Sequence, residues 1–398
     1  MKLKPINEQV VVITGASSGI GRAAALDFGK LGAKVVAAAR DELGLQSLVE
    51  EIRADGGEAI FKVCDVADFS QVTEVAQAAV ERFGRIDTWV NNAAVLLFAK
   101  FEDTTTDEFR RLMEVNFMGQ VHGCKAALPF LRQAGGALIC VSSVESEISM
   151  PLHSAYAASK HAVAGFLDAL RIELLNEGAA ISVTNIRPAS INTPLFNNAR
   201  SKMGVKGKGA PPIYSPQIVA DAIVQAAQKP FRDLIVGGSG KMMISGQKYA
   251  PGLMDLLLSK IGFSQQKTNE PKSETAPDNL FEPTRDDRVE GDMVEQSKSV
   301  SAYTFVETRP VASALIAAGA LGGAALLYRS LRKGSKATNV DGGMSADGLS
   351  ADGLSADGDG MSDGKMSDGR MSAADNLSGD GQTADAVVEF VVVEAVEI

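Results

Sequence analysis

Apolar and polar residues alternate along residues 1–262 in a way that predicts short buried strands separated by helices. The segments between the strands, such as 20–31 and 69–83, have apolar residues at helical spacing. Strands that are apolar on both faces and separated by helices are typical of βαβ units around a parallel sheet. We therefore expect an α/β fold with a doubly wound parallel sheet. The apolar runs that predict its strands are 10–14, 34–39, 59–63, 88–91, 137–142, 181–186 and 234–236.

The pattern changes after residue 262. Residues 263–310 are polar and have no sustained period, which is typical of a linker, and we expect them to be disordered. Residues 311–328 carry no charge and form a candidate transmembrane or membrane-associating helix. Residues 329–398 begin with a basic flank and continue as an acidic Gly/Ser/Asp repeat with too few apolar groups for a core. We therefore expect a single catalytic domain, 1–262, followed by a C-terminal extension that is disordered outside the apolar helix.

The net charge of the chain comes from its tail. The 398 residues carry a formal net charge of −10, and residues 334–398 contain thirteen acidic residues against three basic ones. The rest of the chain is therefore neutral overall, without the basic excess that nucleic-acid binders show. We expect no nucleic-acid partner.

Cysteine and histidine spacing predicts neither disulfides nor a metal site. The three cysteines lie apart in apolar stretches, as in reduced proteins. His122, His153 and His161 lack metal-ligand spacing, and we interpret them as structural or surface residues. The N-terminal sequence lacks the apolar core of a signal peptide. We expect a cytoplasmic catalytic domain, with membrane association through residues 311–328.

A glycine-rich turn, TGASSGIG, directly follows the first predicted strand. Glycines let a backbone turn tightly and approach a pyrophosphate, while the helix that follows supplies free N–H groups and a positive dipole end. The position between a strand and an amphipathic helix favours nucleotide binding over an ordinary turn. The candidate cofactor-binding residues of this turn are Gly15, Ser17, Ser18, Gly19, Ile20 and Gly21.

Tyr156 and Lys160 form a second candidate site, with Ser143 at the end of a predicted strand. On a helix, a tyrosine and a lysine four residues apart share one face. A nearby ammonium group favours the phenolate and so lowers the pKa of a tyrosine from about 10. Such a tyrosine can exchange a proton with a substrate oxygen that a serine hydroxyl polarises. Without the glycine turn, the same pair would more often be two surface residues.

Together these motifs make residues 8 to about 240 similar to the short-chain dehydrogenase/reductase superfamily. Four motifs occur in the family's order: TGASSGIG at 14–21, NNAA at 91–94, Ser143 thirteen residues before Tyr156, and YAASK at 156–160. The resemblance implies a Rossmann fold that transfers a hydride between a nicotinamide cofactor and a carbonyl/alcohol pair. We also expect a homo-oligomer.

The same resemblance implies roles for a catalytic set of Asn116, Ser143, Tyr156 and Lys160. Tyr156 is the expected acid/base, and Lys160 is expected to lower its pKa and hold the nicotinamide ribose. Ser143 is expected to orient the substrate carbonyl, and Asn116 to support a proton relay through water.

Further cofactor contacts are implied by the resemblance alone. Asp65 and Val66 are expected at the adenine, Asn91 against the cofactor, and Thr193 at the carboxamide. Tyr156 and Lys160 are counted among the cofactor-binding residues as well.

Charge near the end of the second strand predicts the choice of cofactor. An acidic residue there commonly holds the ribose 2′-hydroxyl of NAD. Here the strand ends at Arg40, and Arg22 follows the last glycine of the turn. Two guanidinium groups suit a 2′-phosphate, so NADP(H) is favoured, with NAD as the alternative. Asp41 is the one residue in this region that fits NAD better.

Three functions stay open from the sequence. The first is an NADP-dependent oxidoreductase acting on an apolar carbonyl or alcohol, because Met150, Leu152, Leu195 and Phe196 are expected near the substrate. The second is an NADP-binding scaffold or redox sensor with little turnover. The third is a membrane-organising protein that uses the fold to oligomerise. The complete catalytic set favours the enzyme.

The apolar run 311–328 has two possible interpretations. Eighteen residues at about 1.5 Å each span roughly 27 Å, just enough for a hydrocarbon core. The basic flank at 329–336 favours the cytoplasmic side for the tail, yet an NADP-dependent domain is expected on that side too. Either the tail crosses a membrane despite its flank, or the segment only lies against a membrane or a partner.

Overall fold

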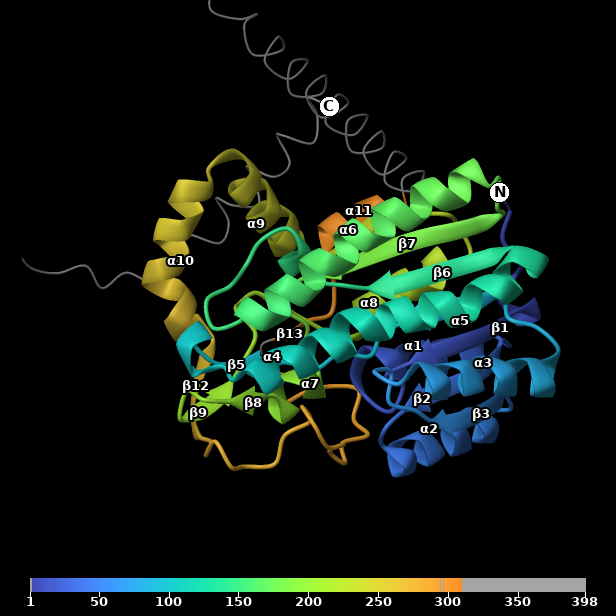
Figure 1. Ribbon diagram of the computed structural model, residues 1–398, viewed down its shortest axis with the longest axis horizontal. Coiled ribbons are helices and arrows are strands. Elements are labelled where there is room, and N and C mark those ends of the chain that lie inside the picture. The colour runs from blue at the N-terminus through green and yellow to red at the C-terminus, as the bar shows by residue number, and fades with distance from the viewer. Residues whose placement is uncertain (1, 294, 296, 310–398) are drawn as a thin grey trace, which may run out of the picture. The chain divides into compact units, whose positions relative to one another are not determined.

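The computed structural model describes residues 2–293, 295 and 297–309, and at its centre is a seven-stranded sheet (Figure 1). The strand order is β11-β7-β6-β4-β1-β2-β3, and all neighbours are parallel. Because the chain moves outward from β1 to β3 and then restarts at β4 on the other side, the sheet is doubly wound. The expected fold class is confirmed. The strands are β1 Val10–Thr14, β2 Lys34–Ala39, β3 Glu58–Val63, β4 Thr88–Asn91, β6 Gly136–Val141, β7 Ile181–Pro188 and β11 Asp233–Val236.

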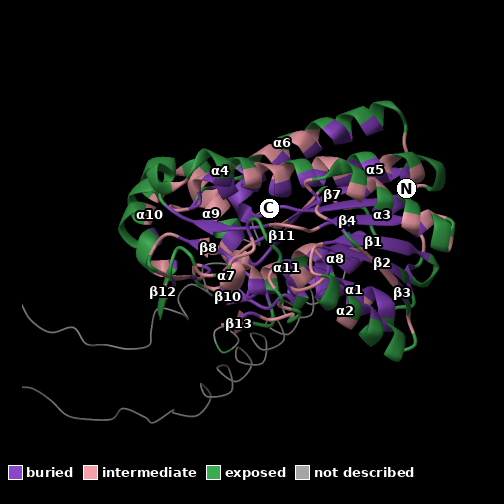
Figure 2. Ribbon diagram, turned by 60° about the horizontal axis from the view of Figure 1, so that its bottom comes forward, coloured by how far each residue is buried: buried purple, intermediate pink, exposed green. Residues whose placement is uncertain are grey.

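Successive side chains of each strand enter two different apolar cores. In β1, Val11 and Ile13 belong to the core under α1, α2 and α8, whereas Val10 and Val12 belong to the core under α3, α5 and α6. The period of two along a strand produces this alternation, and it explains why the runs are apolar throughout. Figure 2 shows the strands as buried between the two layers of helices. The helices are α1 Gly19–Lys30, α2 Glu42–Ala54, α3 Phe69–Phe83, α4 Thr106–Met113, α5 Gly119–Ala134, α6 Ser154–Asn176 and α8 Gln217–Ala226.

Local signals fix where the helices begin and end, as α3 illustrates. The Asp68 carboxylate accepts hydrogen bonds from the backbone N–H groups of Ser70 and Gln71, which lie in the first turn. The residue that caps the end of the helix is Gly84, whose φ of 81° lies in the left-handed region that favours glycine.

Smaller elements extend the domain beyond the carboxyl ends of the central strands. Three short two-stranded sheets pair β5 with β8, β9 with β12 and β10 with β13. The bounds of these strands are β5 Leu97–Phe98, β8 Arg200–Ser201, β9 Val205–Gly207, β10 Ile213–Tyr214, β12 Lys267–Pro271 and β13 Ser297–Lys298. The accompanying helices are α7 Pro194–Asn198, α9 Gly238–Tyr249, α10 Pro251–Gln265 and α11 Ala302–Thr308.

Residues 272–293, which we call the strap, run between β12 and β13 along the side of the domain where α7 and β8 lie (Figure 1). Leu280 at its centre is 0% exposed and belongs to the core under α5 and α6. The expectation of a disordered linker over 263–310 is therefore wrong for its described part. Polar pairs and one buried leucine hold the strap in place. The sequence did not predict this order because such contacts produce no periodic pattern of apolar residues.

The apolar segment 311–328 and the acidic tail, both named from the sequence, lie outside the described residues. In the part of the chain that the structure describes, no helix is long and apolar enough to cross a membrane.

Candidate functional site

One cavity opens at the carboxyl ends of the parallel strands, where the loops after β1, β2, β3, β4, β6 and β7 meet. In a doubly wound sheet, this edge next to the reversal of strand order is where ligands bind. Sequence-predicted residues that line the cavity are Gly15, Ser17, Ser18, Gly19, Ile20, Arg40, Asp65, Val66, Ser143, Tyr156, Lys160 and Thr193.

The turn after β1 brings bare backbone to the cavity. Gly15 has a φ of +65°, and a Cβ there would lie 2.6 Å from the Cα of Ala93. A Cβ on Gly21 would lie 2.2 Å from the Gly15 carbonyl oxygen, so this glycine allows the turn to pack on its own helix. The Asn92 side chain donates to the carbonyl oxygens of Thr14 and Gly15 at 3.2 and 3.0 Å. The residue that follows β4 therefore holds the turn in place.

The two arginines expected at a 2′-phosphate have different surroundings. Arg22 is 5% exposed and points to α2, where it pairs with Glu51 at 2.7 Å and donates to Ser47 and the Gly44 carbonyl. It is not among the residues that line the cavity. Arg40 does line the cavity, and its guanidinium donates to the backbone carbonyls of Asn279 and Phe281 in the strap.

Tyr156 and Lys160 lie one turn apart on α6 and face the cavity together. The Lys160 ammonium is 5.5 Å from the centre of the Tyr156 ring and donates to the Val141 carbonyl at 3.2 Å. Ser143, which follows β6, accepts from the Glu145 N–H and shares a hydrogen bond with the Tyr156 hydroxyl. The structure thus brings the proton-transfer candidates to one place.

Burial controls the proton affinity of both groups. It lowers the pKa of Lys160 to about 8, because an ammonium group loses its hydration there. Burial also raises the pKa of Tyr156, and the negative charge of Glu145 raises it further, while the hydrogen bond with Ser143 opposes both effects. The pKa of Tyr156 is therefore raised, whereas the sequence predicted that Lys160 would lower it.

Two predicted asparagines lie behind the cavity rather than in its wall. Asn116 is fully buried in a short π-helix, Glu114–Met118, and its side chain joins Val95 to Ser159 of α6. Asn91 accepts a hydrogen bond from the Trp89 ring nitrogen at 2.9 Å. Its neighbour Asn92 is the one that lines the cavity.

A buried Glu145–His153 pair also lines the cavity, and sequence analysis missed it. The His153 Nδ1 lies 2.9 Å from a Glu145 carboxylate oxygen, and its ring is 5.8 Å from the Tyr156 ring. Its Nε2 is buried without a hydrogen-bond partner among the described residues. A histidine eight residues after a glutamate carries no recognisable spacing, so only the fold reveals the pair.

The comparisons with known proteins agree with this geometry. Residues 9–204 match the family model described as short chain dehydrogenase. The chain is 38% identical over 328 residues to the uncharacterized oxidoreductase YxnA of Bacillus subtilis (strain 168), covering 82% of this chain and 92% of that one. It is 35% identical to dehydrogenase/reductase SDR family member 7B of Bos taurus, covering 66% of this chain and 84% of that one.

A solved structure supports the same assignment. An alcohol dehydrogenase from the archaeon Thermococcus sibiricus, complexed with 5-hydroxy-NADP, is 27% identical with a TM-score of 0.51. The similarity covers 57% of this chain and 95% of that one. The chain therefore belongs to the short-chain dehydrogenase/reductase family and is a nicotinamide-dependent oxidoreductase that acts on small molecules.

Proposed function

We propose that the protein reduces an apolar carbonyl compound with NADPH, or oxidises the corresponding alcohol with NADP. The observation that carries this proposal is the meeting of Ser143, Tyr156 and Lys160 in the same cavity as the glycine turn. A scaffold or sensor has no chemical need for that set.

The residues of the cavity fit a dinucleotide. Gly15 and Gly19, both at positive φ, present backbone without side chains at the N-terminus of α1, where a pyrophosphate is favoured. Arg40 is the cation that supports a 2′-phosphate and thus NADP over NAD. Arg22 gives no support to this preference, because Glu51 already pairs with it.

Proton transfer falls to the side chains of this chain. The nicotinamide would supply or accept the hydride. Tyr156, kept protonated by burial, would donate its proton to the carbonyl oxygen during reduction, and Ser143 would hold that oxygen by a hydrogen bond. Lys160 would bind the nicotinamide ribose and favour the tyrosinate left after proton transfer.

The substrate half of the cavity supports an apolar compound. Met150, Leu195 and Phe196 line it, and Phe98 packs behind His153 at a ring distance of 4.8 Å. Glu145 and His153 are polar residues of the same lining. We therefore expect a largely apolar substrate that exposes its carbonyl to Ser143 and Tyr156.

The first test measures NADPH and NADH oxidation over a panel of apolar ketones and aldehydes. Tyr156→Phe should bind NADPH like the wild type and lower turnover by about three orders of magnitude, since the general acid is lost. Tyr249→Phe is the matched control, because Tyr249 is 78% exposed on α9. Turnover above a tenth of wild type in Tyr156→Phe would remove this residue from the acid/base role.

A further inference from the structure

The strap forms one wall of the cavity. Asn279, Pro283, Thr284 and Asp286 line the same space as the glycine turn and Arg40. The strap therefore borders this space without filling it. The segment that the sequence predicts as a linker is part of the site.

Strap backbone groups contact residues that we assign to cofactor binding. The Arg288 carbonyl accepts a hydrogen bond from the Gly19 N–H at 2.9 Å. The carbonyls of Asn279 and Phe281 hold the Arg40 guanidinium. The strap thus touches the turn and the 2′-phosphate candidate.

A third contact passes through Arg111 of α4. Its guanidinium pairs with Asp65, the residue expected at the adenine, and also donates to the Leu280 carbonyl. The strap is therefore tied to the residues around the adenosine half of the cavity.

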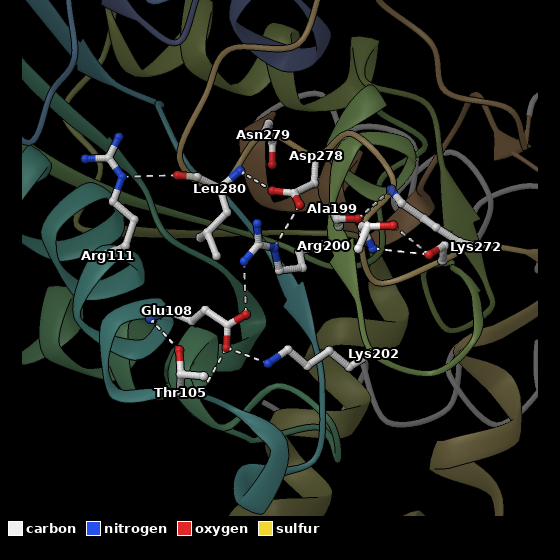
Figure 3. A network of polar contacts seen from close by, with 12 residues as sticks. Thr105, Glu108, Arg111, Ala199, Arg200, Lys202, Lys272, Asp278, Asn279 and Leu280 are labelled. Atoms are coloured by element: carbon white, nitrogen blue, oxygen red, sulfur yellow. Dashed lines mark hydrogen bonds and ion pairs between the residues drawn. The ribbon is translucent and has the colours of Figure 1, made fainter.

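Polar contacts anchor the strap to the domain on either side of these contacts, and Figure 3 shows those around Lys272 and Asp278. Arg200 pairs with Asp278 at 2.8 Å and with Glu108 of α4 at 3.1 Å. Lys272 donates to the Ala199 carbonyl at 2.8 Å. Further along the strap, Glu290 accepts hydrogen bonds from Asn192 and Ser215. The strap is held before and after the stretch that faces the cavity.

Asn279 carries an unsatisfied polar group in the part of the strap that lines the cavity. Its Oδ1 is buried and has no hydrogen-bond partner among the described residues, although its own backbone carbonyl binds Arg40. Buried amide oxygens are nearly always paired, so an unpaired one beside a cavity favours a hydroxyl or N–H donor on the ligand. The hydroxyl groups of a ribose are such donors.

We propose that the strap is the outer wall of the cofactor site and that Asn279 binds a hydroxyl of the adenosine ribose. This inference rests on the proposed NADP(H) dependence and adds a recognition element from outside the sheet. The strap retains the bound dinucleotide, because the dinucleotide cannot leave the adenosine half on that side while Leu280 stays in the core.

The test uses the full chain and measures nucleotide binding by NADPH and NADH fluorescence, with dissociation rates from stopped-flow displacement. Asn279→Ala should raise the Kd for both nucleotides about three- to tenfold, the effect of one lost hydrogen bond. Asn269→Ala, an exposed position on β12, is the matched control and should leave both values unchanged.

Leu280→Ala tests the anchor independently. It should speed NADPH dissociation about tenfold or more with a smaller change in the association rate, because retention acts on the departing ligand. Leu253→Ala, at a side chain 66% exposed on α10, is its control. Circular dichroism checks that each variant is folded, and the Asn279 variant decides the question if Leu280→Ala unfolds.

The outcomes separate the two proposals. Unchanged nucleotide binding in Asn279→Ala, or tighter binding in Leu280→Ala, overturns the strap inference while the proposed function stands; tighter binding would mean that the strap competes with the cofactor. A wild-type chain that binds neither NADPH nor NADH overturns the proposed function, and the strap inference with it.

Discussion

Lys160 serves the proposed function at the expense of the stability of the fold. Its side chain is 1% exposed, and its ammonium donates to the Val141 carbonyl, with no carboxylate of the described residues in salt-bridge contact. A buried charge that is poorly paired destabilises a fold. The charge of Lys160 lies at a position where the nicotinamide ribose and the tyrosinate form of Tyr156 would be its partners.

Replacing Lys160 by Met should therefore stabilise the cofactor-free protein at pH 7 by roughly 2–3 kcal/mol while abolishing turnover. Because the folded-state pKa is lowered to about 8, wild-type stability should rise as the pH increases from 8 to 10.5, the ordinary pKa of a lysine. The advantage of the variant is thus largest below pH 8 and shrinks above it. Urea unfolding at pH 7 and pH 10 measures this; a less stable Met variant at pH 7 would contradict it.

Glu145 offers a second prediction at the residue scale. Its negative charge raises the pKa of Tyr156, so Glu145→Gln should lower that pKa. In alcohol oxidation, where Tyr156 must accept a proton, the rise of kcat/KM with pH should move to lower pH. The pH profile of Glu147→Gln is the control, since Glu147 pairs with Arg187 instead. An unmoved profile in Glu145→Gln would show that Glu145 does not act on the tyrosine.

At the scale of elements, how far each feature is predictable depends on how local its determinants are. The strands of the sheet are readable because burial on both faces leaves continuous apolar runs, and the Tyr156–Lys160 pair is readable because one helical turn holds it. The direction of Arg22 depends on Glu51 in the next helix, and the strap depends on partners far along the chain. Such long-range pairs leave no local pattern.

Substitutions of Arg22 and Arg40 form a matched test of which arginine contacts the 2′-phosphate. Arg40→Ala should weaken NADPH binding by about 1.5–3 kcal/mol more than NADH binding, because only NADPH carries the 2′-phosphate. Arg22→Ala should weaken the two equally or not at all and should instead lower the melting temperature, since it removes a link between α1 and α2. Nucleotide titrations and thermal unfolding distinguish them. A selective loss of NADPH binding in Arg22→Ala would reverse the assignment.

At the scale of the whole molecule, the catalytic domain extends beyond the residues that the sequence indicates. From the sequence, a chain ending at residue 263 contains all strands of the sheet and should bind NADPH like the full chain. The structure changes that expectation, because such a chain lacks β12, the strap and the buried Leu280.

We therefore expect a chain that ends at residue 309 to match the full chain in stability and NADPH affinity. A chain that ends at residue 263 should melt about 5–10 °C lower, mainly through the lost burial of Leu280 and its neighbours, and bind NADPH more weakly. Thermal unfolding and fluorescence titration of both chains check this. Equal values for the two chains would show that residues 264–309 contribute nothing to either property.

The hydrogen bond between the Gly19 N–H and the Arg288 carbonyl also bears on how the protein is made. Gly19 is synthesised well before Arg288, which follows the last strand of the sheet by about fifty residues. Because synthesis adds about 5–20 residues per second, a nascent chain can complete its sheet several seconds before the strap is available. During that interval the adenosine half of the cavity lacks its outer wall, so the newly made protein should acquire firm cofactor retention only after the strap has been synthesised.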